Sequence, residues 1–214
     1  PSPPYVYMVY TYILKTQFGD LYRERLVRYT YTGTTLTARK ILIDGIQANA
    51  THVGSRLVLL EDNTLLMSTG DAQDQTRPQD LNSLSGKILR LNLDGSVPTD
   101  NPIPGSYVYS WGHRNAQGIC AAPNGKIYVS EHGATSDDEL QILQKAGNYG
   151  WPTVEGYCDL SHELSFCTDS NVVQPIAAWT PTIAPSDIIW YDHPAIPELK
   201  GKLLLTTLKA KKLI

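Results

Sequence analysis

Residues 112–152 hold the densest set of side chains able to do chemistry in this chain of 214 residues. The segment contains the pair Arg114-Asn115 and the carboxylate run Asp137-Asp138-Glu139, and it closes on Asn148–Pro152. A strand pair rarely needs so many polar residues at its ends for its own stability. Loops carried on a rigid scaffold are where binding and catalytic residues usually lie. We therefore expect a functional site here.

The carboxylate run Asp137-Asp138-Glu139 suggests metal binding. Three adjacent carboxylates repel one another, and a divalent cation would relieve that repulsion. Calcium is the natural ion, because it takes roughly six to eight oxygen ligands, backbone carbonyls among them. The alternative is a solvated acidic loop that holds no ion.

Composition narrows the class of protein. The chain is 42% hydrophobic and 18% charged, which is typical of a globular protein and allows one domain over residues 1–214. A net charge of -3 and a pI near 5.9 provide no basic field for nucleic acid. No apolar run approaches the ~20 residues of a membrane span. No signal peptide is visible at the start, which alternates like a strand.

The cysteines give two different expectations. Cys120 lies in an apolar stretch and is expected to be a small buried core residue. Cys158 and Cys167 flank a short polar loop and could close it as a disulfide. A disulfide requires an oxidising compartment, so the reduced pair stays an alternative. The Cys and His spacings do not suggest zinc.

The elements that must position these side chains are short β segments separated by turn residues. Lys87–Asp94 alternates leucines with polar residues, which predicts a strand with one buried face. No long segment shows a helical period, and we expect Asp138–Lys145 to form at most one or two helical turns. The other expected strands are Tyr5–Tyr12, Leu26–Tyr31, Leu36–Ile43, Leu57–Leu60, Leu65–Ser68, Ile119–Ala122, Ile127–Ser130, Ile188–Tyr191 and Lys202–Thr206.

One pattern occurs twice. Arg56–Asp71 and Gln117–Gly133 both contain an apolar strand, a turn with Asn, a second apolar strand and a terminal Gly region. Two copies of one hairpin favour the repeated blade of a β-propeller. The alternative fold is a β-sandwich that happens to contain two similar hairpins.

Several blocks of the sequence, taken in order, resemble the soluble quinoprotein sugar dehydrogenases, the glucose/sorbosone dehydrogenase family. That resemblance implies a six-bladed β-propeller that uses pyrroloquinoline quinone (PQQ) and calcium. It covers nearly the whole chain, and the ordered set is more specific than any single block. The blocks are His52 with Gly54 and Arg56-Leu57, Thr69–Asp71, Gly86–Gly95, Gly112–Asn115, Glu131–Gly133, Asp137–Leu140, Asn148–Pro152, Pro181–Ser186 and Leu208-Lys209.

The resemblance implies a catalytic set of three residues. His52 matches the position of the base that takes the sugar hydroxyl proton, a task that suits the ordinary pKa range of histidine. Asp71 matches the carboxylate that orients this histidine and stabilises its imidazolium. Arg114 matches the cation that faces the quinone and stabilises negative charge there.

The resemblance also implies contacts to the cofactor and the metal. Asn115, Thr182 and Lys209 match further positions that contact PQQ. The carbonyls of Gly133 and Ala134 match those that bind the calcium next to the cofactor, although the family usually has Pro where this chain has Ala134. A structural pair of calcium ions would involve Glu139, Tyr149, Glu155 and Asp159.

The sequence departs from the family pattern in length and at its ends. A propeller blade takes ~40–45 residues, so the chain is expected to form about three to four blades, as a partial or shortened propeller. No counterpart of an upstream polar cofactor contact precedes Tyr5, and two arginines of the family would fall after Ile214. Thr51 replaces the carboxylate that stands beside the base.

The expected function is oxidation of an aldose at its anomeric carbon to a lactone, in the periplasm or outside the cell. The partners would be a small sugar and an electron acceptor, with a homodimer as a possible assembly and neither nucleic acid nor a membrane span involved. One alternative is a calcium-stabilised propeller that binds without redox activity. The other is a lactonase-like hydrolase, in which calcium activates water.

Overall fold

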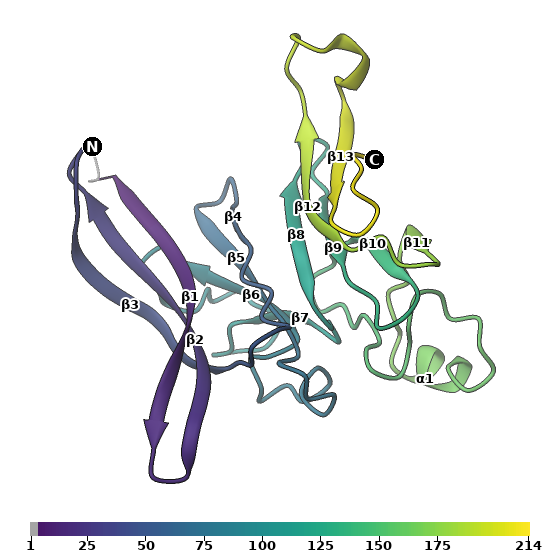
Figure 1. Cartoon of the computed structure of the whole chain (residues 1–214), viewed down its shortest axis with the longest axis horizontal. Coiled ribbons are helices and arrows are strands. Elements are labelled where there is room, and N and C mark those ends of the chain that lie inside the picture. Colours follow the sequence, from purple (N-terminus) through teal and green to yellow (C-terminus); the bar gives the residue numbers. More distant parts are fainter. Residues whose placement is uncertain (1–3) are drawn as a thin grey trace.

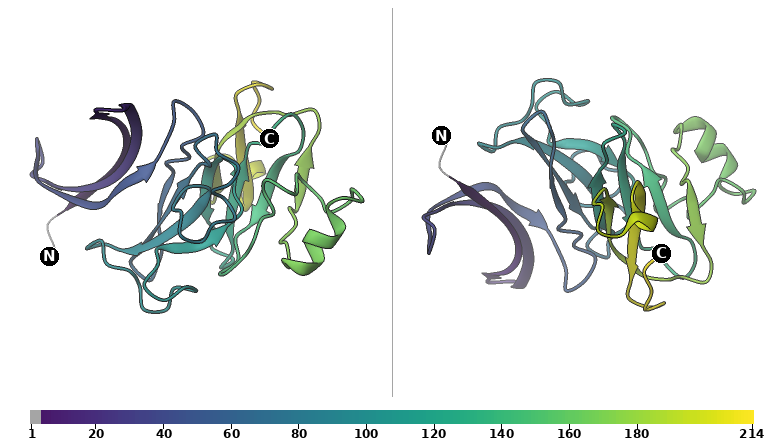
Figure 2. Two further views of the ribbon diagram at one scale, coloured as in Figure 1. Left: turned by 90° about the horizontal axis from the view of Figure 1, so that it is seen from below. Right: turned by 90° about the horizontal axis from the view of Figure 1, so that it is seen from above.

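The computed structural model describes residues 4–214, and its regular secondary structure consists almost entirely of antiparallel strands (Figure 1). Residues 1–3 of the expected 1–214 domain lie outside this part. The strands form four sheets that follow one another along the chain. The N-terminal sheet and the C-terminal hairpin lie apart from each other, with the other two sheets between them (Figures 1 and 2).

The first sheet confirms the predicted hairpin of residues 26–43 and extends it. Its strands are β1 (Tyr5–Thr16), β2 (Gly19–Tyr31) and β3 (Leu36–Gln47), in the order β1-β2-β3. These strands are rich in Tyr, Val, Thr and Ile, whose aromatic and branched side chains suit a pleated surface. The β1–β2 hairpin was not predicted, because the expected strands ended at Tyr12 and began at Leu26, whereas only Gln17-Phe18 separate β1 from β2.

Two four-stranded sheets form the middle of the molecule. The second sheet has the order β4-β5-β6-β7 and the third the order β11-β10-β9-β8. Their strands are β4 (Leu57–Leu59), β5 (Thr64–Thr69), β6 (Lys87–Asn92), β7 (Val108–Trp111), β8 (Ala116–Ala121), β9 (Ile127–Glu131), β10 (Asp138–Ile142) and β11 (Ala177–Trp179).

The C-terminal part contains one short helix and the last sheet. A helix, α1 (Leu164–Asp169), lies in the connection between β10 and β11. The last sheet is the hairpin of β12 (Pro185–Tyr191) and β13 (Lys202–Thr207), with the short 3-10 turn η1 (Pro197–Leu199) between its strands. Within residues 4–214, no helix is long and apolar enough to cross a membrane.

The two similar hairpins occupy equivalent places in successive sheets. The β4–β5 pair and the β8–β9 pair are both antiparallel, and each forms the first two strands of a four-stranded sheet. Strand β8 contacts both β4 and β5 of the preceding sheet. The predicted blade repeat is therefore confirmed, and the four sheets are successive blades of a partial β-propeller.

The core lies between successive sheets and not inside one pair of sheets. One buried cluster joins the first two sheets through Leu26 and Leu89, and a second joins the middle sheets through Leu66 and Val129. A third cluster packs β8 and β9 against the last hairpin, around Ile188. Each middle sheet is thus covered on both faces, which contradicts the sandwich alternative.

Two predictions about single elements were wrong. Strand β6 is buried on both faces from Lys87 to Leu91, because blades pack on both sides of it, whereas the alternating pattern had indicated one buried face. Residues 138–142 form strand β10 and not helical turns, since they pair with β9 and with β11. Pairing to two neighbours outweighs the weak local preference of a polar sequence.

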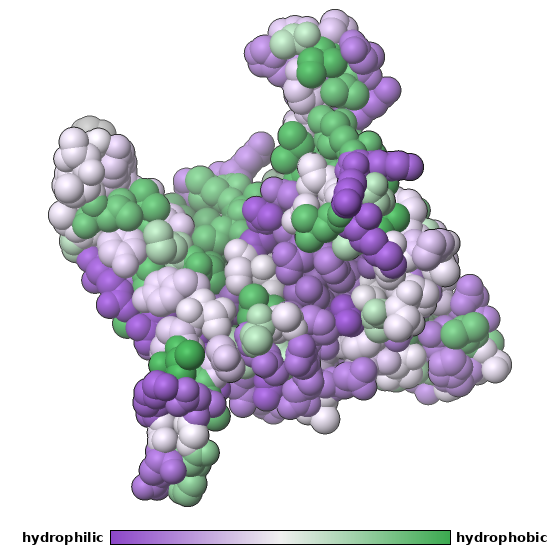
Figure 3. Space-filling model, in the orientation of Figure 1, coloured by the Kyte–Doolittle hydropathy of each residue, from purple (hydrophilic) through white to green (hydrophobic). Residues whose placement is uncertain are grey.

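Apolar side chains reach the surface mainly at the two ends of the row of sheets (Figure 3). On the first sheet, Phe18 at the β1–β2 turn is 91% exposed. On the last hairpin, Ile189 and Leu208 are also exposed. The middle sheets, which carry the polar loops described next, are covered on both sides.

Candidate active site

His52 and Asp71 form the central contact of the site. The Nδ1 atom of His52, in the loop before β4, lies 2.8 Å from Oδ1 of Asp71, which follows β5. Asp71 also accepts hydrogen bonds from the backbone N–H of Gln73 (2.8 Å) and from Trp151 Nε1 (2.9 Å). Both oxygens of the carboxylate act as acceptors, so His52 Nδ1 carries a proton and donates a hydrogen bond to Asp71. The Nε2 atom of a neutral His52 therefore keeps a lone pair that can take a proton.

The end of β5 holds the His52 loop in place. Gly70 passes so close to this loop that a Cβ atom there would overlap the His52 carbonyl. Only glycine permits such an approach. The backbone N–H of Ala72 donates to the same carbonyl at 3.0 Å. The Thr69–Asp71 block thus brings the imidazole and the carboxylate together because its middle residue has no side chain.

Arg114 lines the same cavity as this pair. The cavity has a volume of about 230 Å³. The Arg114 guanidinium carbon lies 5.4 Å from the centroid of the Trp151 ring, and Nη1 donates to the carbonyl of His132 at 3.3 Å. These contacts leave several guanidinium N–H groups free of partners within residues 4–214. The cavity walls are formed by His52, Asp71, Gln73, Gln75, Arg114, Ala134 and Trp151.

A buried carboxylate, Glu131, shapes the loop that carries Arg114. Its side chain accepts hydrogen bonds from the backbone N–H groups of Arg114 and Asn115, the latter at 2.9 Å. Its other oxygen lies 2.9 Å from His113 Nδ1. His113 is fully buried and stacks on Tyr149 with the ring centroids 4.5 Å apart. The end of strand β9 therefore fixes the direction in which the Arg114 loop leaves β7.

Asn115 links the Arg114 loop to the His52 loop. Its Oδ1 accepts hydrogen bonds from the backbone N–H of Gly54 (3.2 Å) and from Gln117 Nε2 (2.9 Å). The side-chain carbonyl is therefore used inside the protein. Only the amide nitrogen of Asn115 remains to meet a cofactor.

Thr182 and Lys209, which the resemblance implies as cofactor contacts, lie together. Lys209 Nζ donates to Thr182 Oγ1 at 2.6 Å. The neighbouring backbone N–H groups of Ile183 and Ala184 donate to Oδ2 of the buried Asp138, at 2.5 and 2.6 Å. Asp138 Oδ1 accepts from the N–H of Gly133 at 2.8 Å. Asp138 therefore ties the Thr182 loop to the loop of Gly133 and Ala134.

A small cavity of about 10 Å³, the size of one water molecule or ion, lies beside Glu139. Burial, together with the nearby charge of Glu131, raises the pKa of Glu139 to about 8. Gln141 Nε2 donates to Glu139 Oε2 at 2.5 Å, while the buried Gln141 Oε1 has no hydrogen-bond partner in the described part of the chain. The Tyr149 hydroxyl donates to the carbonyl of Ile142, so that only its backbone carbonyl is free to bind an ion.

The acidic run does not form one cluster of carboxylates. Strand alternation turns Asp138 away from its neighbours, toward the loops that it joins. Asp137 accepts a hydrogen bond from Thr180 Oγ1 at 2.6 Å, and Glu139 faces the small cavity. Across residues 4–214, no group of three or more His, Cys, Asp or Glu side chains is placed to hold a metal ion. The expectation that the run takes part in metal binding stays a prediction, in which backbone carbonyls would have to supply further ligands.

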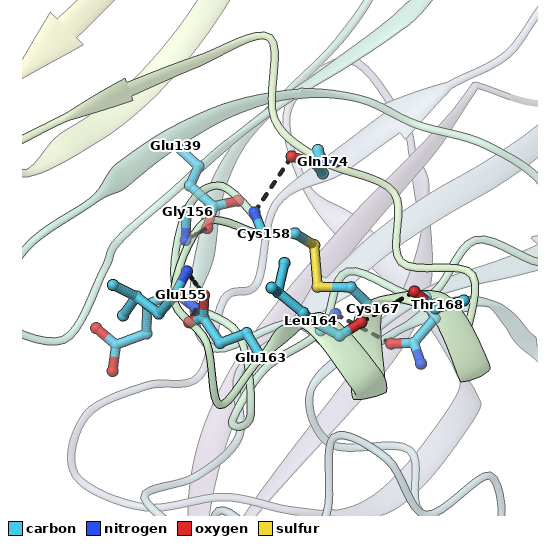
Figure 4. The surroundings of a disulfide bond; sticks show 12 residues. Glu139, Glu155, Gly156, Cys158, Glu163, Leu164, Cys167, Thr168 and Gln174 are labelled. Carbon is cyan, nitrogen blue, oxygen red and sulfur yellow. Dashed lines mark hydrogen bonds between the residues drawn. A yellow bond between two sulfur atoms is a disulfide. The ribbon is translucent and has the colours of Figure 1, made fainter.

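Glu155, another expected metal residue, lies in the surroundings of a disulfide (Figure 4). Cys158 and Cys167 are bonded, which confirms the pairing that the sequence left open, and Cys120 is buried and free. Glu155 lines both the small cavity and a second one of about 480 Å³, whereas Asp159 lines only the second. The structure thus separates Asp159 from Glu139.

Glu131 and Trp151 belong to the site although they were not expected there. Both stand inside blocks that were noticed, beside His132-Gly133 and within Asn148–Pro152. No spacing rule indicates that Glu131 meets a histidine 18 positions away, or that Trp151 meets Asp71 at a separation of 80. The first contact follows from the pairing of β8 with β9, and the second from loops of different sheets that meet.

Known proteins share this sequence pattern. The family model for glucose/sorbosone dehydrogenase matches residues 1–214. Quinoprotein glucose dehydrogenase B of Acinetobacter calcoaceticus is 37% identical over 182 residues, which cover 73% of this chain and 38% of that protein. Aldose sugar dehydrogenase YliI of Escherichia coli (strain K12) is 32% identical over 173 residues, with 76% and 47% covered.

A solved structure agrees. The PQQ-bound form of aldose sugar dehydrogenase from Streptomyces coelicolor superposes with a TM-score of 0.82 at 32% identity, covering 99% of this chain and 58% of that one. The chain spans about two fifths to a half of the two relatives named above. On the match over its full length, this chain belongs to the glucose/sorbosone dehydrogenase family.

Proposed function

We propose that this chain carries the catalytic base and part of the cofactor site of a PQQ-dependent dehydrogenase that oxidises an aldose to its lactone. The observation that carries the proposal is the His52–Asp71 contact of 2.8 Å in a cavity that also contains Arg114. Oxidation of a carbon that bears a hydroxyl needs a base for the O–H proton and a means of stabilising the negative charge that develops. This cavity offers both.

Each residue of this set has a distinct task. His52 takes the hydroxyl proton at Nε2, because its Nδ1 is engaged by Asp71. Asp71 keeps the ring oriented and stabilises the imidazolium once it forms. The Arg114 guanidinium stabilises anionic oxygens in the cavity.

The residues present fit PQQ, whose carboxylates and quinone oxygens call for cationic donors. Arg114 offers N–H groups without protein partners, Trp151 offers a flat wall to the cavity, and Lys209 is held beside Thr182. When bound, PQQ supplies the redox chemistry and accepts the electrons of the sugar. The protein supplies binding, orientation and the proton acceptor.

The residues also fit calcium at two places. The carbonyl oxygens of Gly133 and Ala134 accept no hydrogen bond from residues 4–214, which leaves them free for an ion beside the cofactor. Glu139, the free carbonyl of Tyr149 and the unpartnered Gln141 Oε1 surround the small cavity. Glu155 lines the same cavity, and Asp159 would belong to a separate ion. Oxygen donors of this kind suit a hard cation.

The expected surroundings follow from the same proposal. The disulfide supports a periplasmic or extracellular location, where such bonds persist. The partners would be a small sugar, an electron acceptor and, through the exposed apolar ends, a second subunit. The His52–Asp71 pair favours an enzyme over a pure binding module, which has no use for an oriented base.

The test uses the native full-length protein, supplied with PQQ and calcium. We expect aldose oxidation, followed with a redox dye, that requires both additions. Arg114→Ala should weaken PQQ binding and lower turnover, since a bound anion loses its cation, whereas the exposed Arg39→Ala should change neither. Failure of the native protein to bind PQQ, together with hydrolysis of lactones, would replace this proposal by the hydrolase alternative.

A further inference from the structure

Trp151 contacts both charged partners of the candidate site at once. Its indole Nε1 donates to Asp71 Oδ2 at 2.9 Å, and its ring lies beneath the Arg114 guanidinium at 5.4 Å. The side chain is only 6% exposed. A buried aromatic ring with a satisfied N–H is common in cores, but here the acceptor is the carboxylate that engages His52.

The backbone of Trp151 is held on two sides. Its N–H donates to the carbonyl of Gly112 at 3.0 Å, at the start of the loop that carries Arg114. Its carbonyl accepts from Gln79 Nε2 at 2.9 Å, and the Gln79 amide pairs in both directions with the amide of Asn148. The indole therefore approaches Asp71 from a fixed position.

The hydrogen bonds of Asp71 show why this position matters. Oδ1 serves His52 Nδ1 and the N–H of Gln73, and Oδ2 serves the indole. Without the indole donor, Oδ2 would be a buried acceptor without its partner, and the carboxylate could rotate toward other donors. Rotation would release His52 Nδ1, so that the imidazole could adopt the tautomer whose Nε2 carries the proton and cannot act as a base.

We infer that Trp151 is a positioning residue for the oxidation: its N–H fixes Asp71 and thereby the reactive tautomer of His52, while its ring face holds Arg114. The inference rests on the proposed function, in which His52 is the base. It goes further, because it assigns to one indole the coupling between the proton acceptor and the cation that serves the cofactor.

The decisive substitution keeps the ring and removes the donor. Replacing Trp151 by benzothienylalanine, which has sulfur in place of the N–H, should lower kcat about 10- to 100-fold, as expected for a lost hydrogen bond to a charged group. The affinity for PQQ should change little, because the ring face under Arg114 remains. Trp151→Phe is the genetically encoded version, and Trp190→Phe, a half-buried tryptophan on β12, is the matched control with unchanged turnover.

A double-mutant cycle separates positioning from a merely structural role. If Trp151 acts through Asp71, Trp151→Phe should cost less than about twofold in an Asp71→Asn background. An equal loss in both backgrounds would overturn the inference, as would full activity of the benzothienylalanine protein.

A second readout does not depend on oxidation at all. Long-range proton–nitrogen NMR of the protein without PQQ should show the Nδ1–H tautomer of His52, and the benzothienylalanine protein should show a mixture. Unchanged tautomers would overturn the inference. If the tautomer shifts while His52→Gln keeps full turnover, the positioning role stands and the proposed function is the part that fails.

Discussion

The buried carboxyl of Glu24 makes the stability of this protein depend on pH in an unusual direction. Glu24 lies on β2, is 1% exposed, and accepts a hydrogen bond from Ser55 Oγ, in the loop that begins with His52. Burial raises the pKa of Glu24 to about 8, and the Ser55 hydrogen bond opposes this rise only in part. The carboxyl is therefore mostly protonated in the folded protein at pH 7.

The direction of the pH dependence follows from the protonation of Glu24 in the folded and unfolded states. Between pH 4.5 and about 8 the folded protein holds a proton on Glu24 that the unfolded chain has released, so stability is full at the acidic end and falls as pH rises. From pH 5 to 8 this single group should remove about 3 kcal/mol from the free energy of unfolding.

The Glu24→Gln variant isolates this effect, because its amide has nearly the shape of the carboxyl and does not titrate. Urea unfolding of both proteins at several pH values gives the difference in the free energy of unfolding, in which the other titrating groups cancel. We expect Glu24→Gln to gain about 3 kcal/mol relative to the native protein between pH 5 and 8, whereas the exposed Glu61→Gln should gain nothing. A difference that stays constant over this range would refute the reasoning.

Three further predictions concern metal, cross-link and a buried cation. Millimolar calcium should raise the Tm above its value in chelator, because calcium at 100 times its Kd stabilises the folded state by about 2.7 kcal/mol. Glu139→Gln should lose part of this gain. An unchanged Tm would count against every calcium assignment. Replacing Cys158 and Cys167 by Ser should lower the free energy of unfolding in urea by about 3 kcal/mol, because it removes the cross-link between two positions that are 9 residues apart. Equal stability of the two proteins would show that the disulfide adds nothing. Lys87→Met should lower the free energy of unfolding by about 3 kcal/mol or more, since Lys87 Nζ donates to the carbonyls of Arg77, Pro78 and Ser85. Replacing the exposed Lys126 by Met should leave the stability unchanged. An unchanged stability of Lys87→Met would show that water replaces these hydrogen bonds.

The fold was largely predictable, because turn residues and apolar runs mark each strand. The hairpin of Leu57–Ser68 and that of Ile119–Ser130 reveal the blade repeat by their likeness alone. Burial was harder to predict. Lys87 and Arg90 on β6 are buried because carbonyls and carboxylates of loops in the same sheet satisfy them, and an alternating sequence then resembles a strand with one solvent face.

The site was predictable only in part. Its ordered blocks placed His52, Asp71 and Arg114 in one region, and the structure brings them to one cavity. The direction of each side chain was not predictable, because it depends on strand register and on loops that meet across blades. For this reason the different directions of Asp137, Asp138 and Glu139 were not foreseen, and Trp151 was overlooked.

The most direct test of the account is the role of His52 as the base. In the native full-length protein with PQQ and calcium, His52→Gln should lower the rate of aldose oxidation by ~10²–10⁴-fold while the affinity for PQQ stays unchanged. The exposed His193→Gln is the matched control and should keep the native rate. A His52→Gln protein that binds PQQ and turns over at the native rate would contradict the proposed mechanism at its centre.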